Sequence, residues 1–463
     1  MGCTRNRLKI SGESVFVIAL AAVLSLPSSA WAAFASQFSF SVGEQYNDNI
    51  FFEKKKDHDF VTVITPTLHL YYAPTGQAAP TLNLNISPSG LIYARHSDLN
   101  DFGFSDTSAV TGGYTYFYSP RLTFGFSESF QRQGDTRLPS AGSTGSGFQL
   151  PLTPTSPFPV GGPIPQDRSQ NLKDFVSQGG QLTNNFAFQG NFLYRPDITF
   201  TGGYSNTFTK FLKAGGSDLS QDFSIRGIYN WRQEHNLHVG YSATVNNTRN
   251  GDNGVVHNFD FGDDYFTNQI YNIQLTPTLN LSASTGLSIN TSNSGPRVGN
   301  NSSVTVTKLW ETASLTGGLR KGLTPSFGIS GISDTTSFFT NFNIQLSERI
   351  SANANFDYSF YDTDDVNFKT MQATMGLQYL ITTWLSSSLS YSFRSINSGA
   401  GASNTDLLTR GTVDGSSVFL NVTARFDLWP NQGLARNLSP TTLSPVLRTP
   451  FPTVAPVSTP PKL

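Results

Sequence analysis

From residue 37 onward, stretches of roughly 10–15 residues alternate apolar residues with small or polar ones. One stretch runs over 237–245, where Leu, Val, Tyr, Ala and Val occupy every second position. Others run over 370–379 and 385–394. Successive side chains of a strand point to opposite faces, so the pattern predicts strands with one apolar and one polar face.

The connections between these stretches alternate between short and long. Short turns are predicted at 119–120, 195–196, 232–235, 276–277, 347–349 and 381–383, and longer polar segments at 47–58, 133–175, 211–219, 249–263, 291–302 and 396–414. Tight turns at one end and long loops at the other are typical of an outer-membrane β-barrel. A soluble secreted sandwich would share the strand pattern but has no reason to alternate its connections in this way.

The strands predicted from the pattern are 37–46, 59–72, 80–95, 104–118, 121–132, 176–194, 197–210, 220–231, 236–248, 264–275, 278–290, 303–319, 324–333, 337–347, 350–361, 367–380, 384–395 and 415–427. The predicted fold is an all-β, transmembrane, antiparallel up-and-down barrel of about 18 strands (16–20), with both termini in the periplasm. The pattern is weakest over 303–333, because Glu311 falls on the apolar parity of Leu309 and Leu315. A bulge or a register error is expected there.

Three segments fall outside the predicted strands. Residues 1–32 carry three cationic residues, a 12-residue apolar stretch (15–26) and small residues at Ala30 and Ala32, which predicts a cleaved secretory signal rather than a retained anchor. Residues 133–175 are rich in Pro and Gly and predict a long loop, folded inward or loose outside, because proline cannot donate to a ladder. The barrel domain is therefore 33–429, followed by a Pro-rich, disordered tail over 430–463.

The composition agrees with a barrel and excludes other classes. Only 13% of the residues are charged, yet hydrophobic residues are also scarce at 37%, while aromatic residues reach 13%. These values disfavour a helical bundle, an α/β enzyme and a disordered chain. A net charge of −1 disfavours a partner that is a nucleic acid. A barrel explains the scarcity of both classes, because one face needs apolar residues for lipid and the other lines water.

Charged and amide side chains on the polar parity are candidates for the pore wall. These pore-lining candidates are Arg226, Asn230, Asn343, Gln345, Arg394, Asn421 and Arg425. An arginine in a pore can attract anions or sugar hydroxyls. The alternative for each charged residue is a structural ion pair with a loop or a neighbouring strand.

Loop residues offer no strong site. The acidic clusters 57–59, 260–264 and 362–365 lack the spacing of a calcium loop and read as solvated carboxylates. Lys54, Lys55 and Lys56 predict a solvated tip that could contact lipopolysaccharide phosphates. The six histidines are scattered, and no nucleophile elbow or phosphate loop stands out, so the sequence predicts no enzyme, no cofactor and no metal. Aromatic residues near strand ends predict two interfacial girdles: Tyr72, Tyr118, Tyr194, Trp231 and Trp429 at the turn end, and Tyr46, Phe130 and Phe208 at the loop end.

One stretch carries a family resemblance. Residues 39–52 read SFSVGEQYNDNIFF and are followed by a charged loop and then by DFVTVITPTLHLYYAP. This arrangement resembles the opening of the β-barrel porins of the type 2 group, which are bacterial outer-membrane proteins, some associated with exopolysaccharide systems. The resemblance implies a barrel and an outer-membrane location, and it implies no catalytic residues. The long Pro-rich tail departs from the family pattern.

The function predicted from the sequence is a porin-like channel for the passive passage of small solutes. The alternatives are a barrel component of exopolysaccharide export and a non-conducting structural or adhesive surface barrel. The expected partners are outer-membrane lipid and lipopolysaccharide, the barrel-assembly machinery, and small solutes or a polysaccharide.

Overall fold

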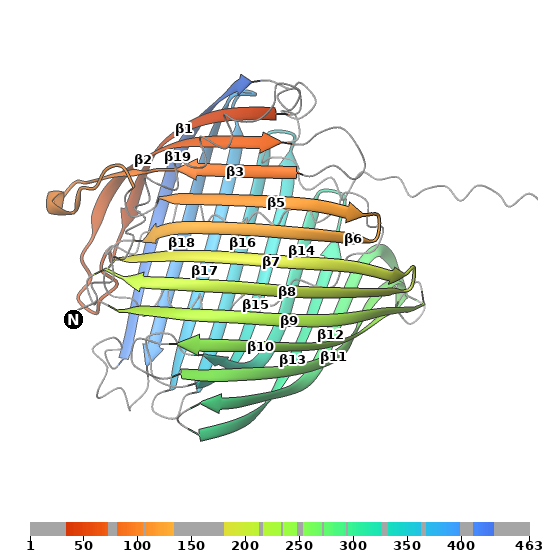
Figure 1. Ribbon diagram of the computed structural model, residues 1–463. Coiled ribbons are helices and arrows are strands. Elements are labelled where there is room, and N and C mark those ends of the chain that lie inside the picture. Colours follow the sequence, from red (N-terminus) through yellow and green to blue (C-terminus); the bar gives the residue numbers. More distant parts are fainter. Residues whose placement is uncertain are drawn as a thin grey trace, which may run out of the picture.

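The computed structural model is a closed antiparallel β-barrel (Figure 1). It describes residues 34–72, 81–104, 108–133, 180–212, 216–232, 235–247, 253–270, 273–292, 295–325, 332–362, 367–398 and 411–429. The strands are β1 (Phe34–Asn47), β2 (Asp59–Tyr72), β3 (Thr81–Ser87), β4 (Gly90–Tyr93), β5 (Ala109–Ser119), β6 (Leu122–Gln133), β7 (Gln181–Arg195), β8 (Ile198–Phe211), β9 (Ser217–Arg232), β10 (His235–Asn247), β11 (Asn253–Ile270), β12 (Ile273–Ser292), β13 (Gly295–Leu309), β14 (Ala313–Pro325), β15 (Ile332–Ser347), β16 (Ile350–Asp362), β17 (Asn367–Leu380), β18 (Leu385–Ser398) and β19 (Gly411–Trp429). A short 3-10 helix, η2 (Ser97–Leu99), follows β4.

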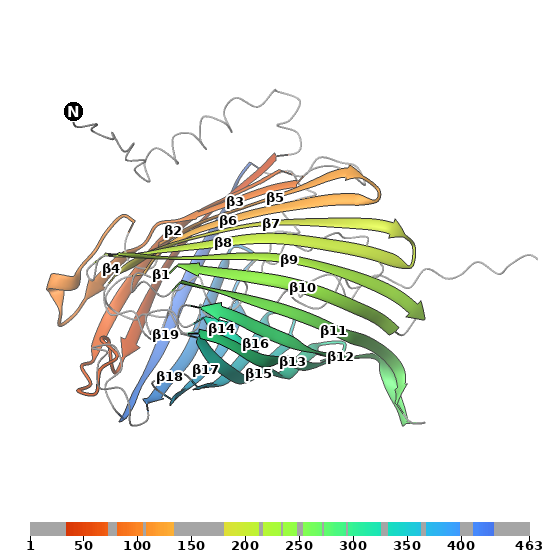
Figure 2. The same cartoon turned by 60° about the horizontal axis from the view of Figure 1, so that its bottom comes forward.

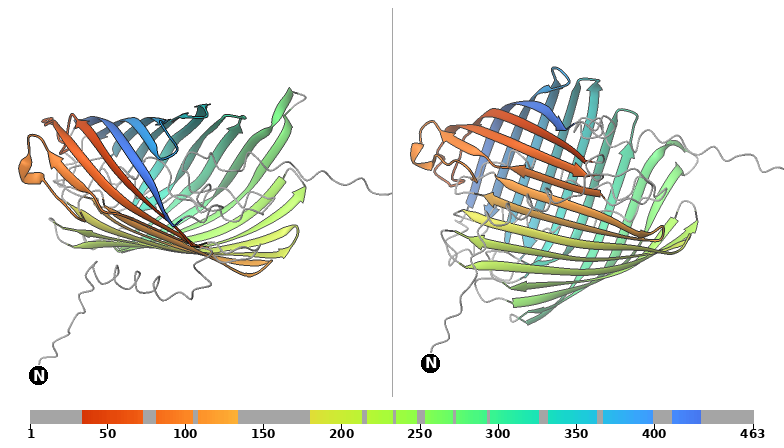
Figure 3. Two further views of the ribbon diagram at one scale, coloured as in Figure 1. Left: turned by 90° about the horizontal axis from the view of Figure 1, so that it is seen from above. Right: turned by 45° about the horizontal axis from the view of Figure 1, so that its top comes forward.

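The ring closes between its first and last strands. β1 pairs with β2 on one side and with β19 on the other, and Figure 1 shows the red β1 beside the blue β19. Both β3 and β4 pair with β2, over Leu68–Tyr72 and Val61–Ile64 respectively, so they are two halves of one strand interrupted at 88–89. The wall therefore has 18 strand positions, which confirms the predicted number. Figures 2 and 3 show the yellow-green and the blue strands on opposite sides of the lumen.

Most predicted connections are confirmed, and three are wrong. Residues 253–263 belong to β11, and β12 and β13 are joined by only two residues, so 249–263 and 291–302 are not long loops. The predicted turn at 276–277 lies inside β12, which instead meets β11 at Ile270 and Ile273. In the first two places Gly, Asn or Asp signalled a break, although the polar face of a strand tolerates these residues. Pro277 lies between Gln274 and Leu279, where the register with β11 shifts, so no ladder partner there needs its missing N–H. The segments 1–32, 134–175 and 430–463 lie outside the described residues.

The weak region of the pattern also has a physical explanation. β13 ends at Leu309 and β14 begins at Ala313, so Glu311 lies exposed in the turn between them. The predicted strand 303–319 therefore joined two strands across their turn, and 324–333 crosses the gap between β14 and β15. Leu309 and Leu315 share a parity in the sequence but belong to different strands.

The strand register divides the wall into two chemically distinct faces. Within the described strands, all the exposed large apolar side chains lie on one face, including Val239 (68% exposed), Val298 (69%) and Met375 (60%). The buried polar side chains of the strands, such as Asp218, His238 and Ser288, all lie on the opposite face. Side chains converge and screen one another inside a barrel but diverge outside it. The apolar face is therefore the outer one, as a membrane barrel requires.

The aromatic side chains at the strand ends agree with the predicted girdles where they are described. Tyr118, Tyr194 and Trp231 are exposed on the outer face beside the short turns, and Phe208 is exposed near the opposite rim. Among the residues that the structure describes, no helix is long and apolar enough to cross a membrane.

The loop after β1 fastens the seam between β1 and β19. The side-chain amide of Asn49 donates to the carbonyl oxygens of Glu53 (2.7 Å) and Asp414 (2.8 Å), and its oxygen accepts the Glu53 N–H (2.9 Å). Lys56 forms ion pairs with Asp414 (2.6 Å) and Asp48 (3.2 Å), so this lysine is not simply the solvated tip that the sequence suggested. Together these contacts hold residues 48–56 to the start of β19.

Replacing Asn49 should loosen this seam. Asn49 is only 2% exposed, so the substitution N49A leaves a backbone N–H and two carbonyl groups short of their partner. We expect the free energy of unfolding to fall by about 2–3 kcal/mol. The measurement is the temperature at which the folded barrel converts to the unfolded form on a heat-modifiability gel.

The matched control is N397A, because Asn397 is exposed on the outer face near the same rim and no side-chain hydrogen bond of it is described. Equal midpoints for N49A and the unchanged protein would contradict a clamp at Asn49.

Candidate functional site

The inner face of the barrel carries the polar side chains on which a transport function would depend. The register places all seven pore-lining candidates on this face: Arg226 and Asn230 in β9, Asn343 and Gln345 in β15, Arg394 in β18, and Asn421 and Arg425 in β19. They are not one cluster, because they lie on four strands around the ring. Their role in lining an open pore stays a prediction.

Arg226 takes part in the structural ion pair that the sequence left as an alternative. Its guanidinium lies 3.2 Å from the carboxylate of Asp260, and His238 Nε2 lies 3.7 Å from the same oxygen. Gly240 separates Arg226 from Asp260 in the register, and a Cβ there would lie 2.5 Å from the Asp260 carboxylate. The missing side chain of Gly240 therefore makes room for the pair. Asp260 had been assigned to a loop, where its inward direction could not be recognised.

Acidic groups dominate this part of the wall. Asp218 and Asp222 lie on the inner face of β9, and Asp222 accepts the hydroxyl protons of Thr244 (2.5 Å) and Ser205 (3.3 Å). Among the inward-facing side chains that the structure describes from β8 to β12, these two and Asp260 are three carboxylates against the one guanidinium of Arg226.

A row of neutral amides and hydroxyls crosses the inner wall from β15 to β19, among the charged side chains of that stretch. One row of neighbours in register consists of Asn341, Asn355, Thr374, Ser392 and Ser417. The Asn355 amide donates to Thr374 (3.2 Å), and the hydroxyls of Ser392 and Ser417 lie 2.7 Å apart. Such a surface offers both donors and acceptors to a hydrated solute without fixing a charge.

Arg394 lies where this wall meets the clamp after β1. A recess in the wall is lined by Arg394, Ser392, Asn47, Asn49, Phe52, and Gly415 to Ser417. Two other candidates donate to their own strands. The Asn421 amide, four residues beyond Ser417 on β19, donates to the hydroxyl of Thr423 (3.2 Å), and the Gln345 amide donates to the carbonyl of Ser347 (2.6 Å). Arg394 is thus the candidate that borders a recess in the wall.

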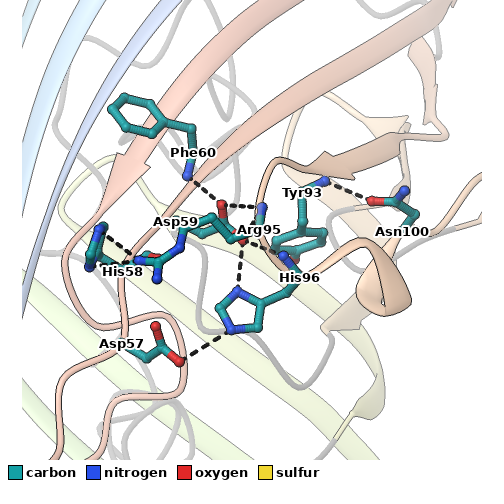
Figure 4. Close-up of polar contacts among 8 residues, drawn as sticks. All are labelled: Asp57, His58, Asp59, Phe60, Tyr93, Arg95, His96 and Asn100. Atoms are coloured by element: carbon teal, nitrogen blue, oxygen red, sulfur yellow. Dashed lines mark hydrogen bonds and ion pairs between the residues drawn. The ribbon is translucent and has the colours of Figure 1, made fainter.

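A clasp of charged residues lies at the loop end, where the segment after β4 meets the start of β2 (Figure 4). The Asp59 carboxylate is fully buried and accepts the backbone N–H groups of Phe60, Arg95 and His96 as well as His96 Nδ1 (2.8 Å). His96 Nε2 also lies 3.2 Å from Asp57. The hydrogen bond to Asp59, followed by the charge of Asp57, raises the pKa of His96 above its usual value.

Apolar side chains pack behind the clasp on the inner face. Val61 and Val63 of β2 contact Leu91 and Tyr93 of β4, and Phe419 packs against them from β19. No group of acidic, histidine or cysteine side chains in the described part of the chain could hold a metal ion. The contacts of Asp57 and Asp59 with His96 make the cluster 57–59 a clasp between the loop after β1 and the segment after β4. Residues 363–365 of the third acidic cluster lie outside the described residues.

Sequence reasoning missed the inner-face residues Arg320, Phe339 and Asp357. Arg320 lies in a segment split between two wrongly predicted strands, and Phe339 follows another phenylalanine, so alternation gave no sign of which ring faces inward. The Arg320 guanidinium carbon lies 4.2 Å from the centre of the Phe339 ring. The register explains the contact. Arg320 pairs with Ser337, two residues before Phe339 on the adjacent strand, so Arg320 and Phe339 are diagonal neighbours on the inner face. Asp357 is the partner of Phe339 on β16.

Comparison with known proteins finds likeness only among solved structures. No family model and no curated protein matches the chain. Pseudomonas aeruginosa OccK2 (OpdF) in complex with glucuronate is 11% identical, with a TM-score of 0.44 over 85% of this chain and 98% of that one. Pseudomonas aeruginosa OpdQ is 10% identical (TM-score 0.43, 86% and 99%), and Acinetobacter baumannii OccAB2 is 8% identical (TM-score 0.45, 87% and 100%). At this level the likeness carries no inference about function, and the resemblance to type 2 porins rests on the motifs at residues 39–52 and 59–74.

The clasp should respond to pH through His96. Because the folded-state pKa lies above the ordinary 6.5, the contribution of the contact to stability is present below about pH 6.5 and is lost as pH rises through the raised value. NMR titration of the barrel with labelled histidine in detergent micelles would measure this pKa. We expect D59N to bring it back toward 6.5.

The control for this titration is D98N. Asp98 lies in the same loop, two residues from His96, but forms no described contact with it. If D98N lowers the His96 pKa as much as D59N does, the clasp geometry is not the cause.

Proposed function

We propose that the protein is an outer-membrane channel that passes small hydrophilic solutes. The observation that carries this proposal is the complete division of the wall: the exposed large apolar side chains of the described strands face outward, and the buried polar ones face inward. A closed sheet leaves no unpaired strand edge, which hydrocarbon would not tolerate. An 18-strand ring is also wide enough to enclose an aqueous path rather than a packed core.

The chemistry of the inner face supports transport rather than catalysis. Asn, Gln, Ser and Thr side chains, with separated arginines and aspartates, suit weak, repeated contacts with a hydrated solute. The proposal includes export by the signal peptide over 1–32, insertion by the barrel-assembly machinery and contact with lipopolysaccharide at the outer rim. The pore-lining candidates supply the contacts along the wall, and the recess at Arg394 lies near the loop end.

Reconstitution in planar bilayers tests the channel directly. We expect discrete conductance steps from the folded barrel, because water and ions fill a polar lumen. Protein that has been heat-unfolded in the same detergent serves as the control. A correctly folded barrel without conductance would overturn the channel and favour a structural or adhesive barrel. Blockade by an added anionic polysaccharide but not by neutral dextran would favour a pore used for one polymer.

The proposed orientation places both chain ends in the periplasm. β1 begins and β19 ends at the rim that carries the short turns after β5, β7 and β15, and short turns of such barrels face the periplasm. The chain has one cysteine, Cys3, within the predicted signal, so the exported protein offers a cysteine-free background. We expect a membrane-impermeant maleimide to label K55C but not E348C on intact cells.

Lysis should make both positions reactive, which controls for burial of either cysteine. Labelling of E348C but not of K55C on intact cells would reverse the proposed orientation.

A further inference from the structure

Charge on the inner face is divided between two arcs of the wall. The arc from β8 to β12 carries Asp218, Asp222 and Asp260 against Arg226. The arc from β13 to β19 carries the opposite excess: Arg297, Arg320, Arg394 and Arg425 against Asp357 and Asp427. Asp427 is exposed at the turn-end rim, where it accepts the Gln37 amide at 2.9 Å. Most of the second arc therefore presents cations to the lumen.

Arg320 is the cation of this arc whose geometry is best defined. Its guanidinium carbon lies 4.2 Å from the centre of the Phe339 ring, close enough for a cation–π contact. The ring in turn lies over Gly318, its neighbour in register on β14, where a Cβ would approach two ring atoms to 2.8 Å. Gly318 thus lets the ring lie against the wall, and the guanidinium lies over the ring.

Groups beside this pair extend the site along one row. Asp357, Gln372 and Arg394 are neighbours in register on β16, β17 and β18, and Phe339 is the partner of Asp357 on β15. The Asp357 carboxylate accepts the Ser359 hydroxyl at 3.0 Å. Arg320 lies diagonally beside the Phe339 end of this row. Adjacent strands lie about 4.8 Å apart, so the row from Phe339 on β15 to Arg394 on β18 crosses about 14 Å of the wall.

The chemistry of the row identifies a class of solute. A guanidinium holds its N–H donors in one plane, which matches the two oxygens of a carboxylate. The Asp357 carboxylate, beside Phe339, can accept hydrogen bonds from hydroxyl groups, and the Gln372 amide on the next strand can both donate and accept. A small hydroxycarboxylate matches both features, whereas a cation would meet Arg320 beside one end of the row and Arg394 at the other.

We propose that Arg320 is the residue that gives this channel its preference for small carboxylates, with Phe339 as its positioning residue. The proposal rests on the proposed channel function. Removing the charge and removing the planar set of donors should have different consequences. The permeability of chloride depends on the charge alone, whereas that of a carboxylate depends on the charge and on the planar donors. This difference allows the role of Arg320 to be separated from a general electrostatic effect.

The test measures reversal potentials of the full-length barrel in planar bilayers under gradients of potassium chloride and of potassium lactate. We expect R320Q to lower the chloride-to-potassium permeability ratio about threefold, the effect of one charge a few ångströms from the path in water. R320K should keep that ratio but lower the lactate-to-chloride ratio about threefold, because the ammonium is a point charge without the fork. F339L should lower the lactate ratio in the same direction, and F339Y should restore it.

The control is K321Q. Lys321 is the next residue of β14 but faces outward, where it pairs with Asp334 at 3.5 Å, so its loss should change neither ratio. Unchanged ratios in R320Q, or equal changes in R320Q and K321Q, would overturn the proposal while the channel itself stands. Should R320Q fail to fold, the lactate ratios of R320K and F339L decide alone. An absence of conductance in the unchanged barrel would instead overturn the proposed function.

Discussion

Every backbone N–H and C=O group that faces hydrocarbon must find a partner within the protein, and this requirement shapes the whole molecule. A sheet meets it only by closing, so the first and last strands must find each other across almost the entire chain. β1 and β19 do so in register from Gln37 with Asp427 to Asn47 with Ser417. The loop after β1 then reinforces the closure with side chains, through Asn49, Asp48 and Lys56. The segment YNDNI, which resembles the opening of a porin family, is thus where the ring is fastened.

Closure also explains how much the sequence could predict. A wall with lipid on one side and water on the other imposes period two on every strand, so the number of strands and the inward parity of Arg226 or Arg394 follow from one sequence. What did not follow is anything that depends on which residues lie side by side. Strand register decides that Arg226 meets Asp260, 34 residues away, and that Arg320 meets Phe339. The alternation of residues within one strand contains no information about register. Strand ends were misplaced for a related reason, since Asn, Gly and Asp on a lumen face look like a loop.

Glycine has a further use on the inner face, where bulky side chains would otherwise fill the lumen. Gly43 lies beneath the Phe419 ring, Gly318 beneath Phe339, and Gly376 beside the Asn353 amide; in each case a Cβ would lie closer than 3 Å to the neighbour. Glycine weakens a strand because it has no side chain to pack. Here the neighbouring strand supplies that packing, so a ring lies along the wall rather than across the opening.

A chain with a net charge of only −1 can still present a strongly polarised lumen. Charges are screened over about 8 Å at physiological ionic strength, so a solute responds mainly to the part of the wall that it approaches. Asp222 and Asp260 lie on one arc and Arg320 and Arg394 on another, and the two sets are separated by intervening strands in both directions around the ring. The two sets therefore do not cancel for a solute that follows one wall. Selectivity in such a lumen depends on which part of the wall a solute follows, and Arg320, placed over the Phe339 ring, marks one such part.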